Sequence, residues 1–192
     1  MSDILNHFIE TCRVHNPAAA AGGYPPFTAP FRRETPLNSA PYIFPFADFR
    51  TTFGTNARRR RIIADAEAAL DALRRHGLMW HLLIVGGSFI RDEDRPSDLD
   101  ALVVYALDPA MAADAAPVIA GIPPILRRHP HVDFKFCPID ISPLILVKRL
   151  LFFANLFSYD KDTHAMSRGS IVVLPETLPE TLNASGIEDA CA

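Results

Sequence analysis

The apolar residues of this chain recur with two different periods, and each period predicts a different kind of element. A spacing of three and four residues predicts a helix between Asn56 and Gly77, with Ile62, Ile63, Ala66, Ala69, Leu70 and Leu73 as its apolar positions. Asn56 is suited to cap the start of this helix, and Gly77 follows its end as a stop signal. Further helices are expected over residues 3–15, from about 109 to 128, and over 143–157.

Nearly continuous apolar runs predict strands that are covered on both faces. The two clearest runs are Trp80 to Val85 and Leu99 to Tyr105. Two more strands are expected over His131 to Cys137 and Ser170 to Leu174. Helices that alternate with strands in this way place the chain in the α/β or α+β class. We expect a mixed sheet of about four to five strands with helices packed on it.

A segment rich in proline, alanine and glycine, residues 16–45, interrupts this pattern near the start of the chain. Proline lacks a backbone donor, so regular structure should be scarce there. Five aromatic residues in this segment and a sixth directly after it argue against a simple linker, and we expect an extended arm over a hydrophobic surface of this chain or of a partner. The expected organisation is an N-terminal helix and arm over 1–56, a domain over 57–175 and a loose tail over 176–192. The aromatic residues are Tyr24, Phe27, Phe31, Tyr42, Phe44 and Phe46.

Length and composition narrow the class of protein. The 192 residues suffice for one domain with a core, and 49% hydrophobic with 21% charged residues is typical of a globular protein. A net charge of −3 gives no general indication of nucleic-acid binding, although a local contact stays open. The cysteines Cys12, Cys137 and Cys191 are isolated, which favours a reducing cytoplasm over a disulfide or zinc framework. We expect no signal peptide and no membrane contact.

The residues that indicate chemistry lie between the two clearest strands. The first strand ends in Gly86, Gly87 and Ser88, where the backbone can approach a ligand closely and its N–H groups can hold phosphate oxygens. Asp98 and Asp100 follow after a polar loop, and alternate residues of a strand project to the same side. Two adjacent carboxylates on an apolar strand need a neutralising partner, and Mg²⁺ with substrate phosphates is the natural one.

A third carboxylate would complete a site for two Mg²⁺ ions. We expect Asp133, on the next strand, to fill this role, with Asp140 as the alternative. Asp133 has a second interpretation, as an exposed strand residue paired with Lys135. In a two-ion site, one metal lowers the pKa of the attacking hydroxyl and the other stabilises the leaving pyrophosphate.

A Gly-Ser turn, a spacer and an Asp-x-Asp strand resemble the nucleotidyltransferase superfamily, which includes polymerase beta and the small minimal nucleotidyltransferases. The resemblance covers roughly residues 58–174 and implies a palm-like sheet. It implies that Gly87 and Ser88 bind the β- and γ-phosphates of a nucleoside triphosphate, most simply ATP. It also implies that Asp98, Asp100 and Asp133 are the catalytic, metal-binding carboxylates.

The resemblance carries two expectations about function. In the first, the chain is an Mg²⁺-dependent enzyme that moves a nucleoside monophosphate, AMP from ATP, to a protein, RNA or small-molecule acceptor. In the second, it is an antitoxin-like or regulatory binding partner that keeps the fold with little or no turnover. The aromatic arm and the apolar helix over 143–157 would suit a protein partner or a homodimer.

Other polar residues have weaker indications. Arg58 to Arg61 are expected either to be solvated or to contact phosphate or RNA. Lys161 and Arg168 are expected to be solvated loop charges or to close over a triphosphate. His81, at the head of an apolar strand, is expected to be a packed histidine rather than a catalytic one.

Overall fold

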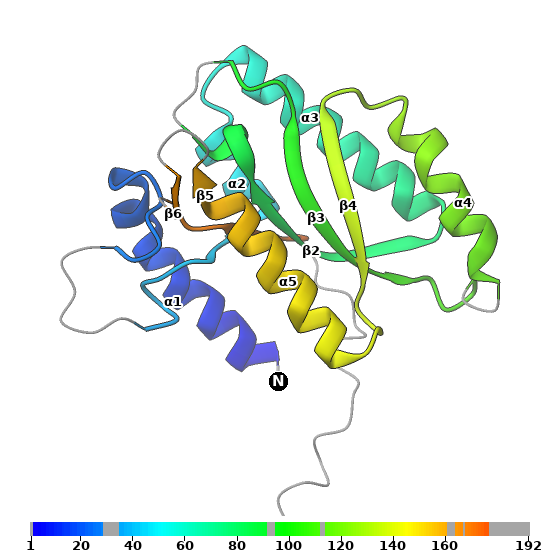
Figure 1. Ribbon diagram of the computed structural model, residues 1–192, viewed down its shortest axis with the longest axis horizontal. Coiled ribbons are helices and arrows are strands. Elements are labelled where there is room, and N and C mark those ends of the chain that lie inside the picture. Colours follow the sequence, from blue (N-terminus) through cyan, green and yellow to red (C-terminus); the bar gives the residue numbers. More distant parts are fainter. Residues whose placement is uncertain are drawn as a thin grey trace, which may run out of the picture.

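A mixed five-stranded sheet with helices on both faces forms the centre of the protein (Figure 1). The computed structural model describes residues 2–28, 35–91, 95–111, 114–160, 164–166 and 168–176. The strand order is β1-β7-β2-β3-β4, so the two strands with the clearest apolar runs, β2 and β3, are both interior. The strands are β1 (Tyr42–Pro45), β2 (Leu78–Gly86), β3 (Leu99–Leu107), β4 (Val132–Pro138) and β7 (Ile171–Leu174).

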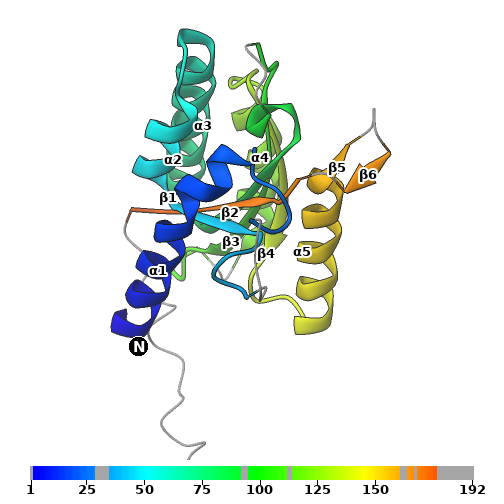
Figure 2. The ribbon, with the colours of Figure 1, turned by 90° about the vertical axis from the view of Figure 1, so that its left-hand side faces the viewer.

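The described residues form five α-helices, and Figure 2 shows α2 and α3 on one side of the sheet and α5 on the other. A two-stranded pair, β5 (Tyr159–Asp160) with β6 (Ala165–Met166), follows α5 within the segment expected to be a polar loop. The architecture confirms a mixed α/β protein of the α+β type. The helices are α1 (Ser2–Ala21), α2 (Phe46–Phe53), α3 (Ala57–Arg75), α4 (Ala115–Leu126) and α5 (Pro143–Ser158).

Two cores result from this layering. The larger lies on the α1–α4 side and contains fully buried residues such as Phe49, Phe89 and Val103. The smaller lies between the sheet and α5, where Leu102 and Cys137 meet the inner face of the helix. Because β3 alternates between the two cores, both of its faces are apolar, as its sequence predicts.

Helix α3 shows how local signals set an element's bounds. The Asn56 side chain accepts a hydrogen bond from the Arg59 backbone N–H at 2.9 Å, which caps the first turn. Gly77 has φ +93°, a conformation that glycine adopts without strain, and the chain turns there into β2. Both predicted ends of this helix are confirmed.

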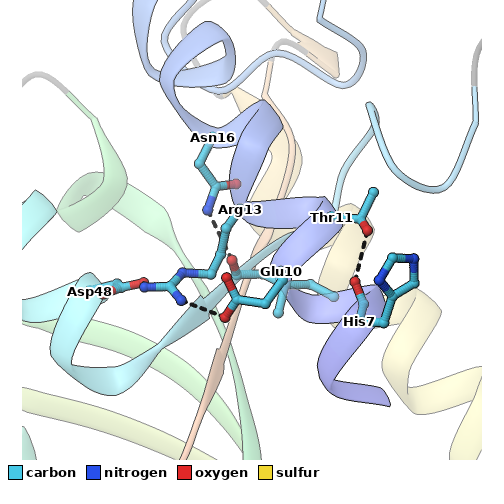
Figure 3. A network of polar contacts seen from close by, with 7 residues as sticks. His7, Glu10, Thr11, Arg13, Asn16 and Asp48 are labelled. Atoms are coloured by element: carbon cyan, nitrogen blue, oxygen red, sulfur yellow. Dashed lines mark hydrogen bonds and ion pairs between the residues drawn. The ribbon is translucent and has the colours of Figure 1, made fainter. Parts of the chain in front are cut away.

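The N-terminal segment departs from the prediction. Helix α1 continues past residue 15, through Pro17, to Ala21, because residues 18–21 are all alanine, the strongest helix former. Its side chains fasten it to later elements (Figure 3). Arg13 pairs with Asp48 of α2 at 2.7 Å, and the Asn16 amide donates to the Ile43 carbonyl of β1 at 3.0 Å.

The expectation of little regular structure between residues 16 and 45 is therefore wrong at the two ends of the segment, which belong to α1 and β1, and holds for the described residues between them. β1 lies parallel to β7 at the edge of the sheet, and its pairing partner is more than a hundred residues away in the sequence. Three aromatic residues of the segment, Tyr24, Tyr42 and Phe44, are buried in the chain's own larger core, whereas Phe27 is 53% exposed. Phe31 lies outside the described residues. Residues 1–56 thus contribute to the same sheet and core as residues 57–175.

Helix α4 begins at Ala115, later than the expected residue 109, because the Asp114 side chain caps it there. Its last turns include Pro123 and Pro124, and Val118 and Ile122 anchor it in the larger core. None of the described helices is both long and apolar enough to cross a membrane. Within the expected tail, only residue 176 lies among the described residues.

Candidate functional site

The Gly-Ser turn lies against Asp100. β2 ends at Gly86, and residues 87–90 form a single 3₁₀ turn in which Gly87 has φ +69°. A Cβ atom at Gly87 would overlap the Asp100 Oδ2 atom and lie 3.1 Å from Asp100 Cγ. A side chain at position 87 would have to displace that carboxylate, and the positive φ also favours glycine, so the turn and the acid fit closely together.

The three predicted carboxylates lie at one end of neighbouring strands. Asp100 is on β3, paired with Gly86 of β2 on one side and with Asp133 of β4 on the other. Residues paired in register point to the same face of a sheet, so Asp100 and Asp133 share the face that α5 covers. Asp98 precedes the first residue of β3 and accepts a hydrogen bond from the Ser97 hydroxyl at 2.6 Å.

The Asp133 carboxylate forms an ion pair with a lysine of its own strand. The Lys135 ammonium donates to Asp133 Oδ1 at 2.8 Å, and both side chains are about half exposed. This is the second of the two interpretations that the sequence allows. Asp140, the alternative third acid, follows the opposite end of β4, beside Tyr105. Burial, and after it the charge of Asp140, raises the pKa of the Tyr105 hydroxyl there, so Asp140 is remote from the Gly-Ser turn.

The carboxylates of the candidate site are the kind of ligand that suits Mg²⁺, but they are too few to coordinate the ion fully. Carboxylate oxygens are the ligands that Mg²⁺ prefers, and Mg²⁺ is commonly held by one or two carboxylates with substrate phosphates. Among the described residues, no three His, Cys, Asp or Glu side chains are gathered to hold a metal ion. Asp98 and Asp100 are of the ligand type that Mg²⁺ prefers, and a bound substrate would have to supply further oxygen ligands.

Two arginines of α3 hold the ends of the loop that joins the turn to the acids. Arg59 is buried, and its guanidinium donates to the carbonyls of Phe89 and Arg91 at the start of the loop. Arg58 donates to the carbonyls of Pro96 and Ser97 at its end, each at 3.1 Å. Arg58, Arg60 and Arg61 are exposed, which agrees with the solvated face that the sequence allows, whereas Arg59 is buried and departs from it. The bonds of Arg58 and Arg59 go to main-chain atoms around the site.

A buried acid that the sequence did not single out lies beside the same loop. Asp160 of β5 is 6% exposed, and its Oδ2 atom lies 3.1 Å from an Arg168 nitrogen and 3.9 Å from an Arg91 nitrogen. Arg168 is thus bound within the protein rather than solvated. Lys161, expected to act with it, lies outside the described residues.

Comparison with known proteins identifies a family. Residues 29–174 match the model of a family described as a family of unknown function (DUF6932). The chain belongs to the DUF6932 family. The match includes every strand of the main sheet, the Gly-Ser turn and the three acids. No curated protein and no solved structure matches the chain.

Gly87→Ala tests the contact between the turn and Asp100 in this DUF6932 chain. The added Cβ must push the Asp100 carboxylate aside, and φ +69° is strained for alanine. We expect the free energy of unfolding to fall by about 1–2 kcal/mol. Chemical denaturation measures this change, with Gly23→Ala as the control. Gly23 also has positive φ but has open space around its Cβ position, so an equal loss in both variants would contradict the contact.

His81 lies in the core, and replacing it would measure how much a buried imidazole lowers the free energy of unfolding. It is 3% exposed, at a bulge in β2, and within the described residues neither ring nitrogen has a hydrogen-bond partner. Burial lowers the pKa of the His81 imidazole, so the folded protein excludes a proton that the unfolded chain binds. The free energy of unfolding therefore falls as the pH drops below about 6.5 towards the lowered pKa, because the unfolded chain gains a proton on His81 first.

We expect His81→Leu to raise the free energy of unfolding at neutral pH by about 1 kcal/mol, since it removes an unsatisfied polar group. Below about pH 6.5 the wild type should lose up to about 1.4 kcal/mol per pH unit more than the variant. Urea denaturation near pH 7.5 and pH 5.5 measures both effects. Parallel pH dependence of the two proteins would show that His81 is not the group responsible.

Proposed function

We propose that this chain is an Mg²⁺-dependent nucleotidyltransferase that moves a nucleoside monophosphate, AMP from ATP, to a protein, RNA or small-molecule acceptor. One observation carries the proposal: the Asp100 carboxylate lies directly against Gly87, at the point where a strand ends in a Gly-Ser turn. Backbone N–H groups of such a turn can hold phosphate oxygens, and the acid beside them can hold the cation that accompanies phosphates.

The described residues have distinct roles in this proposal. The backbone around Gly87 and Ser88 binds the β- and γ-phosphates, and Asp98 and Asp100 hold the cation. When bound, Mg²⁺ offsets the charge that develops on the phosphate and pyrophosphate oxygens. Arg58 and Arg59 keep the loop between turn and acids in place through its backbone. Asp133 is one strand from Asp100 and joins the site on release from Lys135.

A second candidate function rests on the pairing of Asp133 with Lys135. If Asp133 stays in that ion pair, the site has two carboxylates, enough to bind Mg²⁺ with a nucleotide and too few for a complete two-ion centre. The chain would then be a regulatory or antitoxin-like binding partner with little turnover. In either function it would work in the cytoplasm, where the buried Cys12 and Cys137 remain thiols.

Label transfer separates the two candidates. The protein is incubated with Mg²⁺, ATP labelled on the α-phosphate, and a cell extract that supplies acceptors. A transferase labels a protein, RNA or small molecule and releases unlabelled pyrophosphate. Binding of ATP without label on any acceptor supports the regulatory function, and absence of ATP binding contradicts both.

A further inference from the structure

Helix α5 is apolar both on the face that packs against the sheet and on the opposite, exposed face. Its inner side packs in the smaller core through Leu146, Leu150, Phe153 and Phe157. Its outer side is also apolar, although monomeric proteins seldom leave such a surface uncovered. The outer residues are Leu144 (77% exposed), Ile145 (45%), Val147 (52%), Leu151 (59%), Phe152 (59%) and Leu156 (49%).

We propose that the outer face of α5 binds the same face of a second copy, so that two α5 helices pack antiparallel across a two-fold axis. The helix has the composition for such an interface. It contains no acidic residue, and its exposed polar residues include Lys148, Arg149 and Asn155. Arg149 is bound to the Phe136 carbonyl of β4, whereas Lys148 and Asn155 lie among the outer apolar residues. A groove of about 790 Å³ between α5 and β4, lined in part by Phe136 and Phe152, extends the apolar surface towards the edge of the sheet.

The area available agrees with a stable dimer. At about 100 Å² for each of the six exposed apolar side chains, two copies would bury on the order of 1,200 Å². That exceeds the roughly 1,000 Å² expected of a biological interface. The neighbouring sheet edge is less suited to pairing with a second copy, because Lys135 lies on β4 and Arg149 donates to the Phe136 carbonyl at 3.1 Å.

The positions of the two polar residues fix the expected arrangement. Lys148 and Asn155 are seven residues, about two turns, apart, so they lie on the same stripe of the helix. An antiparallel pair centred between Leu151 and Phe152 places Lys148 of one copy opposite Asn155 of the other. The two Lys148 residues are then about 10 Å apart along the axis, and each ammonium faces an uncharged amide rather than the other cation.

Sedimentation velocity over a range of protein concentrations tests this proposal. The wild type is expected to sediment as a dimer, and Leu151→Glu as a monomer with an unchanged circular dichroism spectrum. The matched control is Val14→Glu, the same kind of change at a residue of α1 that is 75% exposed, and it should remain dimeric. A monomeric wild type, or a Leu151→Glu variant that still dimerises, would overturn the proposal.

A charge exchange tests the antiparallel register with substitutions at exposed polar positions. Asn155→Lys places two cations opposite each other and is expected to raise the dimer dissociation constant at least tenfold. Adding Lys148→Glu to that variant creates an opposite-charge pair in each half of the interface and should restore the wild-type constant. If the double variant is as weak as Asn155→Lys alone, the helices do not pack in this register and the proposal fails.

Discussion

Replacing Asp100 with asparagine is expected to reduce nucleotide transfer by about a thousand-fold or more. The substitution keeps the size of the side chain beside Gly87 and removes the charge that would hold the cation. A loss of about 4 kcal/mol in transition-state stabilisation corresponds to this factor, and metal ions contribute several kcal/mol in such sites. Initial rates of label transfer measure the effect, and the thermal midpoint should stay close to that of the wild type.

Asp140→Asn is the matched control for this prediction. It makes the same chemical change at an exposed acid beyond the other end of β4. Its transfer rate should equal the wild-type rate. A variant Asp100→Asn that retains more than about a tenth of the activity would place the cation elsewhere, because a loss of less than about 1.4 kcal/mol is too small for a metal ligand.

Replacing Arg59 with methionine is expected to destabilise the protein by about 3 kcal/mol. Methionine keeps much of the apolar length of the side chain. It leaves the carbonyls of Phe89 and Arg91 without the charged donor that now binds them. It also removes the guanidinium from the Phe89 ring, 5.2 Å from the ring centroid. For a chain of this length the thermal midpoint should fall by roughly 6–12 °C.

Arg61→Met is the control for Arg59, because Arg61 is exposed on the same helix and its loss should change the free energy of unfolding by less than about 0.5 kcal/mol. We also expect Arg59→Met to weaken ATP binding at temperatures where the variant remains folded, because the loop between the turn and Asp98 loses its anchor. Equal stability of the two variants would show that the buried arginine does not hold the loop.

Elements whose signals are local could be predicted from the sequence. The cap at Asn56, the stop at Gly77 and the apolar runs of β2 and β3 each depend on neighbouring residues. The bounds of α4 were less accurate, because the cap at Asp114 competes with an earlier start at Pro109. These are differences of a few residues in elements that were correctly recognised.

Interactions between distant segments could not be predicted. β1 is four residues long and includes a proline, and its place in the sheet depends on pairing with β7, far away in the sequence. The bonds of Arg58 and Arg59 go to backbone carbonyls thirty or more residues further along the chain, and a backbone carbonyl has no sequence signature. Asp160 acquires its arginine partners in the same way.

The candidate site depends both on local sequence signals and on contacts between distant segments. The sequence indicates a glycine-rich turn followed by two acids, but not that Gly87 is in contact with Asp100. Adjacent strands also indicate that Asp133 lies near Asp100, which the register bears out. The choice between metal ligand and partner of Lys135 depends on side-chain geometry, and that geometry places Lys135 next to Asp133.

A crystal structure with Mn²⁺ and a non-hydrolysable ATP analogue would show where the cation and the phosphates bind. Mn²⁺ substitutes for Mg²⁺ at oxygen ligands, and its anomalous scattering locates it independently of the atomic coordinates. We predict an Mn²⁺ ion coordinated by Asp98, Asp100 and phosphate oxygens, with those phosphates bound to the backbone at Gly87 and Ser88. A nucleotide and metal bound elsewhere, or a metal that contacts neither acid, would contradict the account.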